Sequence, residues 1–467
     1  MLYTLYCTDR NTKDRVSFLF DSKTSRSFKG NGEEIDFSFD SRFINQPRFQ
    51  RHESAIVASS QSEIFKKNHL WPYRTTKFEP FSETNPLVGK SRQLAKLRIQ
   101  LGFACNYRCQ YCLQSRSSLE KVPKKEDVDF FMQNLIHSGI TLEEGGVIDL
   151  WGGEPLLYWQ TLVHLLPALR KCFGVDTKLS LFTNGVLLNK EKIDFLLGNR
   201  VQVEISHDGI GFSLRNLEDP FDNPRIKREW LYLWEKSRAK GIPMGFFSVI
   251  TPLNCDLYEN LQFFKNHFTE EAYFQFGGAA SETENLPTNC LLSEENVRTL
   301  SSCFIKAIED KGSCWHGINR RVFNLMGRII HRIPVDSIQY HCSSVDSSVL
   351  NVNLKGDVIS CQNRNAKDFK IGDIDKLQDV VNPHFRHWST RKYCPDCLVL
   401  ASCKGGCPDL SDEGFERCCQ NEWAFQFAVF SAAWYLLTGT VIEEVSPKPN
   451  FRKQIPISTS LEGDEIC

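Results

Sequence analysis

From about residue 95, segments with strand character alternate with segments that look helical. Strand-like apolar runs occupy 94–103, 145–153, 177–185, 200–209, 243–251 and 272–278. Amphipathic segments that predict helices occupy 124–139, 161–174, 190–199, 228–241 and 292–310. Alternation of this kind predicts a parallel α/β sheet or barrel. Six strands are too few for a complete eight-stranded barrel.

The remaining sequence predicts further domains around this α/β unit, which we place at 95–300. Residues 1–94 contain short β-type runs separated by polar turns and predict a small region that contains a sheet. Residues 301–341 predict a bridging helical segment. Residues 342–422 are loop-rich and dominated by Cys and Gly, as expected where metal replaces a hydrophobic core. Residues 423–467 predict a C-terminal helix and a tail.

Charge and hydrophobicity exclude several functions. The formal net charge of −1 gives no support to nucleic-acid binding by bulk electrostatics. The longest apolar stretch, 423–437, is shorter than the ~18 residues that a membrane span needs and predicts a buried helix instead. The N-terminal sequence has no apolar signal core, so we expect a cytoplasmic protein. In that reducing setting, 18 cysteines indicate metal or catalytic roles rather than disulfides.

Three of the cysteines lie in one short loop, FACNYRCQYC, directly after the strand predicted at 94–103. We call Cys105, Cys109 and Cys112 the first cysteine group. A structural zinc ion normally takes four protein ligands. Three thiolates suit a [4Fe–4S] cluster in which one iron has no protein ligand. A zinc loop completed by a distant ligand is the alternative that spacing alone leaves open.

Polar residues follow the next three predicted strands as well. The second strand ends in WGGEP, in which Gly152 and Gly153 allow close backbone approach and Glu154 offers a carboxylate for an ammonium group. The third and fourth strands end in polar residues, and Arg215 follows a few positions later; these are Thr183, Asn184, Ser206 and Asp208. Parallel α/β folds place active sites at this edge, so we expect these side chains to line one cleft.

CNYRCQYC, WGGEP and SHDG together resemble the cluster loop, the GGEP motif and the ribose-site segment of the radical S-adenosylmethionine (radical SAM) superfamily. The resemblance implies a partial (β/α)6 barrel of the TIM type. It implies that the first cysteine group ligates a [4Fe–4S] cluster whose unique iron is chelated by SAM. The remaining SAM contacts that it implies are Gly152, Gly153 and Glu154 at the methionine amino group, Ser206 and Asp208 near the ribose, and Tyr111 beside the adenine. Arg215 would pair with the SAM carboxylate, or is a surface arginine.

The C-terminal cysteines resemble a SPASM domain, the extension that carries auxiliary [4Fe–4S] clusters in one branch of that superfamily. Supporting matches are KGGCP at 404–408 and IGDI at 371–374. The resemblance implies a distal cluster on Cys394, Cys397, Cys403 and either Cys418 or Cys419, which we call the distal group. It implies a nearer auxiliary cluster on Cys342, Cys361 and Cys407, the nearer group. Two zinc ribbons are the alternative.

The nearer group departs from the family pattern, because many members have another cysteine a few residues after the first. Positions 343–360 contain none. Two possibilities follow: an open iron that binds substrate, or a borrowed ligand such as Cys314. With a borrowed ligand the cluster would serve only as an electron relay.

The resemblance implies reductive cleavage of SAM to a 5′-deoxyadenosyl radical, which abstracts hydrogen from a substrate. SPASM members mostly act on peptides, so the leading hypothesis is a maturase that forms a thioether or carbon–carbon crosslink in a ribosomally made precursor peptide. Residues 1–94 would recognise a leader peptide, by edge-strand pairing for example, or pack on the barrel. A flavodoxin or ferredoxin would supply electrons.

Two alternatives remain. An anaerobic sulfatase maturase would begin closer to its cluster loop, would have a fully ligated nearer cluster, and would carry a catalytic Asp where this chain has Gln362. A non-catalytic iron–sulfur or zinc sensor would explain the cysteines but would leave GGEP and SHDG without a purpose.

Overall fold

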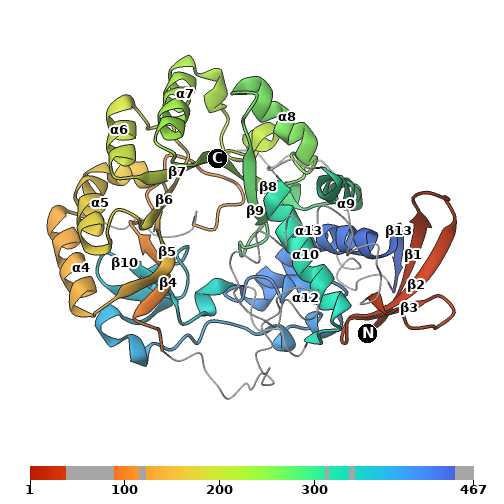
Figure 1. Ribbon diagram of the computed structural model, residues 1–467. Coiled ribbons are helices and arrows are strands. Elements are labelled where there is room, and N and C mark those ends of the chain that lie inside the picture. Colours follow the sequence, from red (N-terminus) through yellow and green to blue (C-terminus); the bar gives the residue numbers. More distant parts are fainter. Residues whose placement is uncertain (38–88, 115–122, 311–314, 336–341, 448–467) are drawn as a thin grey trace, which may run out of the picture.

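The computed structural model describes residues 1–37, 89–114, 123–310, 315–335 and 342–447. A nine-stranded sheet in the order β12-β11-β10-β4-β5-β6-β7-β8-β9 curves into an open barrel (Figure 1). Strands β4 to β9 are parallel and follow the chain order. They are β4 (Gln93–Gln100), β5 (Thr141–Trp151), β6 (Lys178–Thr183), β7 (Val201–Ser206), β8 (Met244–Ile250) and β9 (Phe274–Ala279). The predicted partial barrel with six parallel strands is confirmed.

Helices cover the outer face of this sheet (Figure 1). They are α4 (Lys125–His137), α5 (Trp159–Phe173), α6 (Lys190–Gly198), α7 (Pro224–Ala239) and α8 (Leu257–His267). In α5 the buried Leu162, Leu165, Leu166 and Leu169 recur at helical spacing and form its apolar face. Helix α8 was not predicted. Its start is fixed by Asp256, whose side chain accepts hydrogen bonds from the first-turn amides.

The two faces of β4 show how one strand serves both the core and the barrel interior. Leu97 and Ile99 are fully buried. The alternate positions are polar: the guanidinium of Arg98 is 3.1 Å from the Ser344 hydroxyl, and Gln100 donates to the Gln362 carbonyl at 2.7 Å. Alternation along this strand therefore gives β4 one apolar face and one polar face, and the polar face contacts the cysteine-rich region.

The cysteine-rich region extends the barrel sheet, which the sequence did not predict. It supplies β10 (Val349–Asn353), β11 (Asp357–Ile359) and β12 (Lys370–Asp373). Strand β10 pairs in parallel with β4, with Val349 opposite Lys96. The short helices α11 (Ala366–Phe369) and α12 (Leu400–Cys403) and several 3₁₀ turns complete the region. This pairing attaches the region directly to the first barrel strand.

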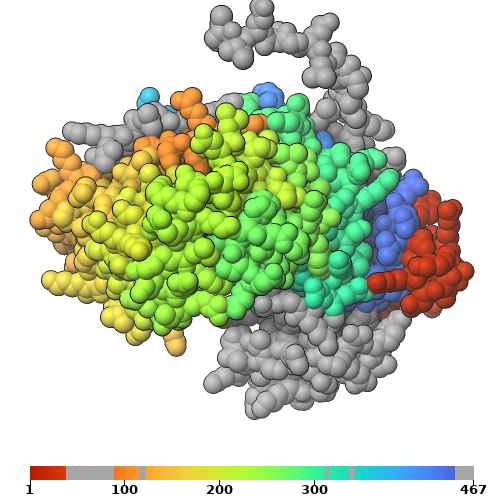
Figure 2. Space-filling view, turned by 90° about the horizontal axis from the view of Figure 1, so that it is seen from above, coloured from red at the N-terminus to blue at the C-terminus, as the bar shows by residue number. Residues whose placement is uncertain are grey.

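A second, four-stranded antiparallel sheet lies at the side of the barrel, in the order β13-β1-β2-β3. Its strands are β1 (Leu2–Asp9), β2 (Arg15–Asp21), β3 (Arg26–Lys29) and β13 (Thr440–Ser446). The predicted N-terminal sheet is present, but one of its strands comes from the segment predicted as a tail. Figure 2 shows the red N-terminal strands beside the blue C-terminal segment, away from the yellow part of the barrel.

Helix α13 (Asp412–Thr438) joins these parts. Ser411 caps its N-terminus, and Gly439 ends it in the left-handed conformation. Phe20 and Trp434 meet edge to face with ring centroids 6.1 Å apart, so the helix packs against the second sheet. Its neighbours are α9 (Glu294–Glu309) and α10 (His316–Ile330).

Two predicted domain boundaries need correction. The boundary after residue 422 falls inside α13, because the cysteine-bearing turn and the apolar stretch form one uninterrupted helix. The boundary after residue 300 falls inside α9. The Ser293–Asn296 capping predicted for α9 is present as a reciprocal capping box. Within the described ranges, no helix is both long enough and apolar enough to cross a membrane.

Candidate active site

The four segments singled out in the sequence lie at the same edge of the barrel. The first cysteine group follows β4, and Gly152 to Pro155 follow β5. Thr183 and Ser206 are the last residues of β6 and β7, and Asn184 and Asp208 come shortly after them. These four strands are neighbours in the sheet. The expected convergence of strand ends is therefore present, and the contacts below show which side chains meet.

The first cysteine group is held by a tight loop in which the Cys112 amide donates to the Cys109 carbonyl at 3.0 Å. Backbone amides also donate to sulfur: Tyr107 N lies 3.4 Å from the Cys105 Sγ. Burial and the nearby thiols raise the pKa of Cys109 to about 12, although Arg215 opposes this. The three thiols act electrostatically on one another, so their thiolate forms would repel. A bound cation would remove this repulsion. The donor set fits an iron–sulfur cluster.

Gly152 and Gly153 pack closely against the backbone of the cluster loop, and their predicted contact with SAM stays a prediction. The Gly153 amide donates to the Gly102 carbonyl at 2.9 Å, and the Glu154 amide donates to the Ala104 carbonyl at 2.8 Å. A Cβ on Gly153 would lie only 2.4 Å from the Ala104 carbonyl oxygen. The glycines thus let the backbone of the cluster loop pack against WGGEP.

Glu154 is buried and its carboxylate binds the end of β6. It accepts hydrogen bonds from Thr183 Oγ1 at 2.5 Å, from the Asn184 amide at 2.7 Å and from the Leu156 amide at 2.9 Å. The Asn184 side chain continues this network to Asn106 in the cluster loop at 2.7 Å. Asn106 was not predicted, although it lies within the quoted motif. Glu154 also acts electrostatically on Cys105, which places its charge near the first cysteine group.

Asp208, Arg215 and Tyr111 form a second buried network. The Arg215 Nε lies 2.9 Å from Asp208 Oδ2 and its Nη2 donates to Oδ1 at 3.1 Å, while the Tyr111 hydroxyl donates to the same carboxylate. The amide of Val249 on β8 donates to Asp208 at 2.9 Å. Arg215 is 8% exposed, so the surface-arginine alternative is wrong. Its guanidinium is paired with Asp208.

Ser206 is half-buried at the end of β7. The next residue, His207, is fully buried and lies 3.0 Å from Asp219. Its ring stacks on Phe212 with centroids 4.5 Å apart. His207 therefore helps to fix the turn that carries Asp208. Of Ser206 and His207, only Ser206 is partly exposed to solvent.

The nearer group also comes together. The pKa of Cys361 is raised by burial and by Cys342, and that of Cys407 is raised by burial with contributions from Cys361 and Cys342. Backbone amides donate to two of these sulfurs at 3.4 Å: Ser344 N to Cys342 and Asn363 N to Cys361. The three thiols are close enough to act on one another. Cys314, the predicted alternative ligand, lies outside the described residues.

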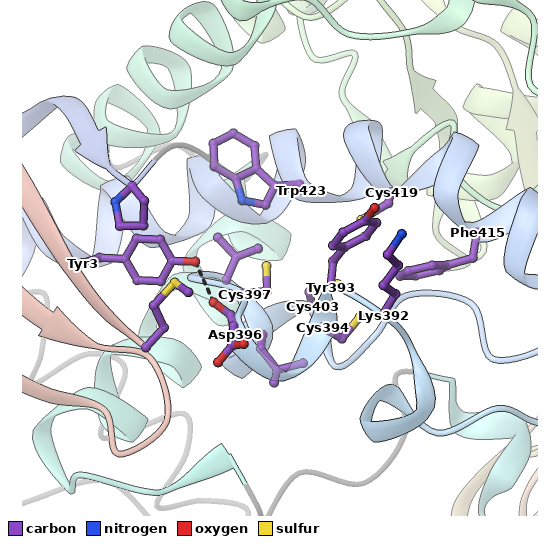
Figure 3. A pocket seen from close by; sticks show the side chains of 14 residues that line it. Tyr3, Lys392, Tyr393, Cys394, Asp396, Cys397, Cys403, Phe415, Cys419 and Trp423 are labelled. Atoms are coloured by element: carbon purple, nitrogen blue, oxygen red, sulfur yellow. Dashed lines mark hydrogen bonds between the residues drawn. The ribbon is translucent and has the colours of Figure 1, made fainter. Parts of the chain in front are cut away.

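Four thiols of the distal group line a cavity of about 280 Å³ (Figure 3). They are Cys394, Cys397, Cys403 and Cys419. Cys418 lies elsewhere: its thiol donates to the Thr283 carbonyl at 2.8 Å. The cavity and its four sulfurs fit a cluster of the [4Fe–4S] type.

Strand β1 supplies part of the cavity wall, as Figure 3 shows for Tyr3. The Tyr3 hydroxyl donates to the Asp396 carbonyl at 2.6 Å, between Cys394 and Cys397. Nothing in the sequence pointed to this contact, since the two residues are 393 positions apart.

In the described part of the chain, no three His, Cys, Asp or Glu side chains converge on a position for a single metal ion. The thiols of a [4Fe–4S] cluster do not share one ion, because each binds a different iron.

Hydrogen bonds connect the cluster loop with the segment after Cys361. Gln114 donates to the Asn363 side chain at 3.0 Å, and Gln100 on β4 donates to the carbonyls of Gln362 and Arg364 at 2.7 and 2.9 Å. These contacts were not predicted. They join the first cysteine group and the nearer group to the same end of β4.

Comparison with known proteins agrees with this geometry. Residues 99–259 match the model of the radical SAM superfamily. A GTP 3′,8-cyclase of Peptoclostridium acidaminophilum is 34% identical over 125 residues, which cover 26% of this chain and only 37% of that enzyme.

Two relatives are similar over a longer range. The radical SAM cyclopropyl synthase TigE of Paramaledivibacter caminithermalis is 21% identical over 388 residues, or 77% of this chain and 78% of TigE. A serine-type anaerobic sulfatase-maturating enzyme of Bacteroides thetaiotaomicron is 23% identical over 345 residues, or 66% of this chain and 81% of that enzyme. Both similarities extend beyond the barrel.

Among solved structures, anSMEcpe with bound AdoMet and the Cp18Cys peptide superposes with a TM-score of 0.51 at 18% identity. The superposition covers 73% of this chain and 97% of that one. At this identity the similarity establishes the fold.

Proposed function

The chain is a radical SAM enzyme with a SPASM-type C-terminal region, and we propose that it modifies a ribosomally made peptide by forming a thioether or carbon–carbon crosslink. When bound, the [4Fe–4S] cluster and SAM supply a 5′-deoxyadenosyl radical that abstracts hydrogen from the substrate. The non-catalytic sensor is set aside, since the relatives are enzymes.

Three groups of residues would have separate roles in binding the cluster and SAM. The first cysteine group would hold the cluster. Glu154, fixed by Thr183 and Asn184, would present its charge to the amino group of SAM. Asp208 and Arg215 would act as one paired unit beside Tyr111, and not as two independent SAM ligands.

The main support for an oxidative crosslink is the set of hydrogen bonds between the segments that carry the first cysteine group and the nearer group. The contacts Gln114–Asn363 and Gln100–Gln362 fix the segment after Cys361 at the mouth of the barrel. An acceptor held there can take the electron that a substrate radical releases when a new bond closes. Bond formation between two side chains needs such an acceptor.

Gln362 favours crosslinking over sulfatase maturation. Its side-chain oxygen accepts a hydrogen bond from Arg98 at 3.3 Å. An amide has no basic carboxylate to remove a proton, and the sulfatase-maturase hypothesis requires an Asp at this position. Similarity to a sulfatase-maturating enzyme nevertheless makes this the second candidate.

The proposed peptide substrate has two supports. The solved relative anSMEcpe is described with a bound peptide. In addition, β13 is one outermost strand of the second sheet, whereas the other outermost strand, β3, already pairs with residues 33–35 through the Phe28–Glu34 bridge. Edge strands can accept an extended peptide by backbone pairing, so leader recognition by the N-terminal region stays a prediction.

The test is anaerobic reconstitution followed by assay with SAM and dithionite, or with a flavodoxin or ferredoxin as the proposed reductant. Candidate precursor peptides and a sulfatase-type Cys or Ser peptide are offered in parallel. We expect 5′-deoxyadenosine together with a precursor that has lost two hydrogen atoms. A hydrazide-reactive aldehyde on the sulfatase-type peptide would support the second candidate and contradict the first.

A further inference from the structure

Arg98 lies on the polar face of β4 and contacts the segment that follows Cys342. Its guanidinium is 3.1 Å from the Ser344 hydroxyl and 3.2 Å from the Ser343 hydroxyl. The Ser344 amide in turn donates to the Cys342 sulfur at 3.4 Å. A single residue, Ser344, therefore joins the Arg98 guanidinium to one thiol of the nearer group.

The same guanidinium contacts the segment that follows Cys361. It donates to the side-chain oxygen of Gln362 at 3.3 Å. That oxygen also accepts a hydrogen bond from the Cys361 thiol at 3.6 Å. Arg98 is thus connected through one residue on each side to two of the three thiols of the nearer group.

Other residues fix the backbone of these two segments separately. Lys90 donates to the carbonyls of Ser344 and Asp346 at 2.8 and 2.7 Å. Gln100 donates to the Gln362 carbonyl at 2.7 Å. Each of these contacts holds one segment, whereas the Arg98 guanidinium contacts both and links them to each other.

The charge of this guanidinium is only partly balanced by the protein. The Arg98 side chain is 12% exposed, and its acceptors at 3.1–3.3 Å are neutral hydroxyl and amide groups. The carboxylate that pairs with it in the described part of the chain is that of Asp149, 3.9 Å from Nε, and this carboxylate lies closer to Lys96, at 3.2 Å. A buried cation is unfavourable without an anionic partner. An iron–sulfur cluster with thiolate ligands is an anion and would supply that partner.

We propose that Arg98 is a positioning residue of the nearer auxiliary cluster. Its fork of N–H groups holds the Cys342 and Cys361 segments at the spacing that the cluster needs. Residues that contact metal ligands in this way orient them, and their loss commonly costs about 10–100-fold in metal affinity. The positive charge of Arg98 stabilises the reduced, more negative cluster and so raises its reduction potential.

The consequence for electron transfer rests on the proposed function. When a crosslink closes, the substrate radical loses one electron to the oxidised nearer cluster and one proton to water. A higher reduction potential makes that cluster a better electron acceptor. The positioning role itself does not depend on the substrate.

The experiment uses the full-length holoenzyme after anaerobic reconstitution. Arg98→Met removes the charge and the hydrogen bonds, and Arg98→Lys keeps the charge but lacks the planar fork. The matched control is Arg92→Met, which changes an exposed arginine directly before β4. A redox titration followed by EPR gives the midpoint potential of the nearer cluster, whose signal is the one that Cys361→Ala lacks. The loss of that signal during incubation with a chelator of ferrous iron gives the rate of iron release.

We expect R92M to match wild type in both measurements. R98M should shift the balance towards the oxidised cluster by about tenfold or more, which for one electron is a fall of about 59 mV in midpoint potential. Both R98M and R98K should release iron about tenfold faster than wild type, and R98K should keep a potential close to that of wild type. An R98M chain with the wild-type potential would contradict the role of the charge, and an R98K chain with wild-type iron release would contradict the role of the fork. Either result overturns the assignment.

An R98M chain without the nearer cluster needs a further measurement. A wild-type circular dichroism spectrum and wild-type SAM cleavage, with a loss of about four irons per chain, would support the assignment. If R98M does not fold, Ser344→Ala, which removes one acceptor of the guanidinium, takes its place beside R98K. Faster iron release in both then supports the assignment, and wild-type release in either contradicts it. None of these measurements needs a peptide, so they can fail while peptide modification succeeds, or the reverse.

Discussion

Gly153→Ala is the most direct test of how WGGEP supports the cluster loop. The new Cβ would lie 2.4 Å from the Ala104 carbonyl oxygen and 2.6 Å from that of Phe103. Both distances are about 1 Å shorter than ordinary van der Waals contact. Both neighbours are backbone atoms of the loop that leads into Cys105, and no flexible side chain can move aside. The φ of Gly153 is not in the left-handed region, so the effect is steric.

Relief of this contact requires the cluster loop to move by roughly 1 Å. Overpacking of this kind costs about 1–3 kcal/mol, and a displacement of about 1 Å at a reacting centre can cost about 100-fold in rate. We therefore expect G153A to keep its auxiliary clusters and to form 5′-deoxyadenosine about 100-fold more slowly. The rate is measured by liquid chromatography after anaerobic incubation with SAM and dithionite.

Gly278→Ala is the control, because a Cβ on Gly278 meets no atom within 4 Å. It should retain the wild-type rate and iron content. A G153A enzyme that cleaves SAM as fast as wild type would refute the conclusion that WGGEP fixes the cluster loop by close backbone packing.

Three further predictions concern buried groups. Burial raises the pKa of Glu204 to about 7 in the folded chain. The contribution of protonated Glu204 to the free energy of unfolding is therefore complete below pH 4.5 and is lost as the pH rises towards 7. In thermal melts from pH 5 to 8, we expect wild type to lose about 3 kcal/mol of stability in this way and E204Q to lack that loss. Iron analysis should show a loss of about four irons per chain in C419A and none in C418A, and the opposite pattern would assign the distal ligand to Cys418. R215K cannot keep both contacts to Asp208 and should lose about 2 kcal/mol in urea unfolding; unchanged stability would argue against the paired unit.

The parts of the fold that the sequence predicts are those encoded locally. Strand–helix alternation located β4 to β9, because each strand and each amphipathic helix carries its own periodicity. The cysteine loop and the polar strand ends were found for the same reason. Parallel strands then bring their ends to one edge without further information.

Contacts between distant segments could not be found in this way. The pairing of β1 with β13 joins residues more than 430 positions apart, and neither strand signals its partner. The pairing of Arg215 with Asp208 depends on the turn between them, so a motif that suggested a SAM ligand did not reveal an internal ion pair.

The partnership of β1 and β13 has a consequence for the order in which the enzyme is completed during translation. Thr4 pairs with Ser446, so at about 5–20 residues per second β1 waits on the order of 20 to 90 seconds for its partner. The barrel and its cluster loop are synthesised long before that moment. Since Tyr3 forms part of the distal cavity wall, we expect this cavity to be completed last. Iron can then reach the distal group before β1 pairs with β13.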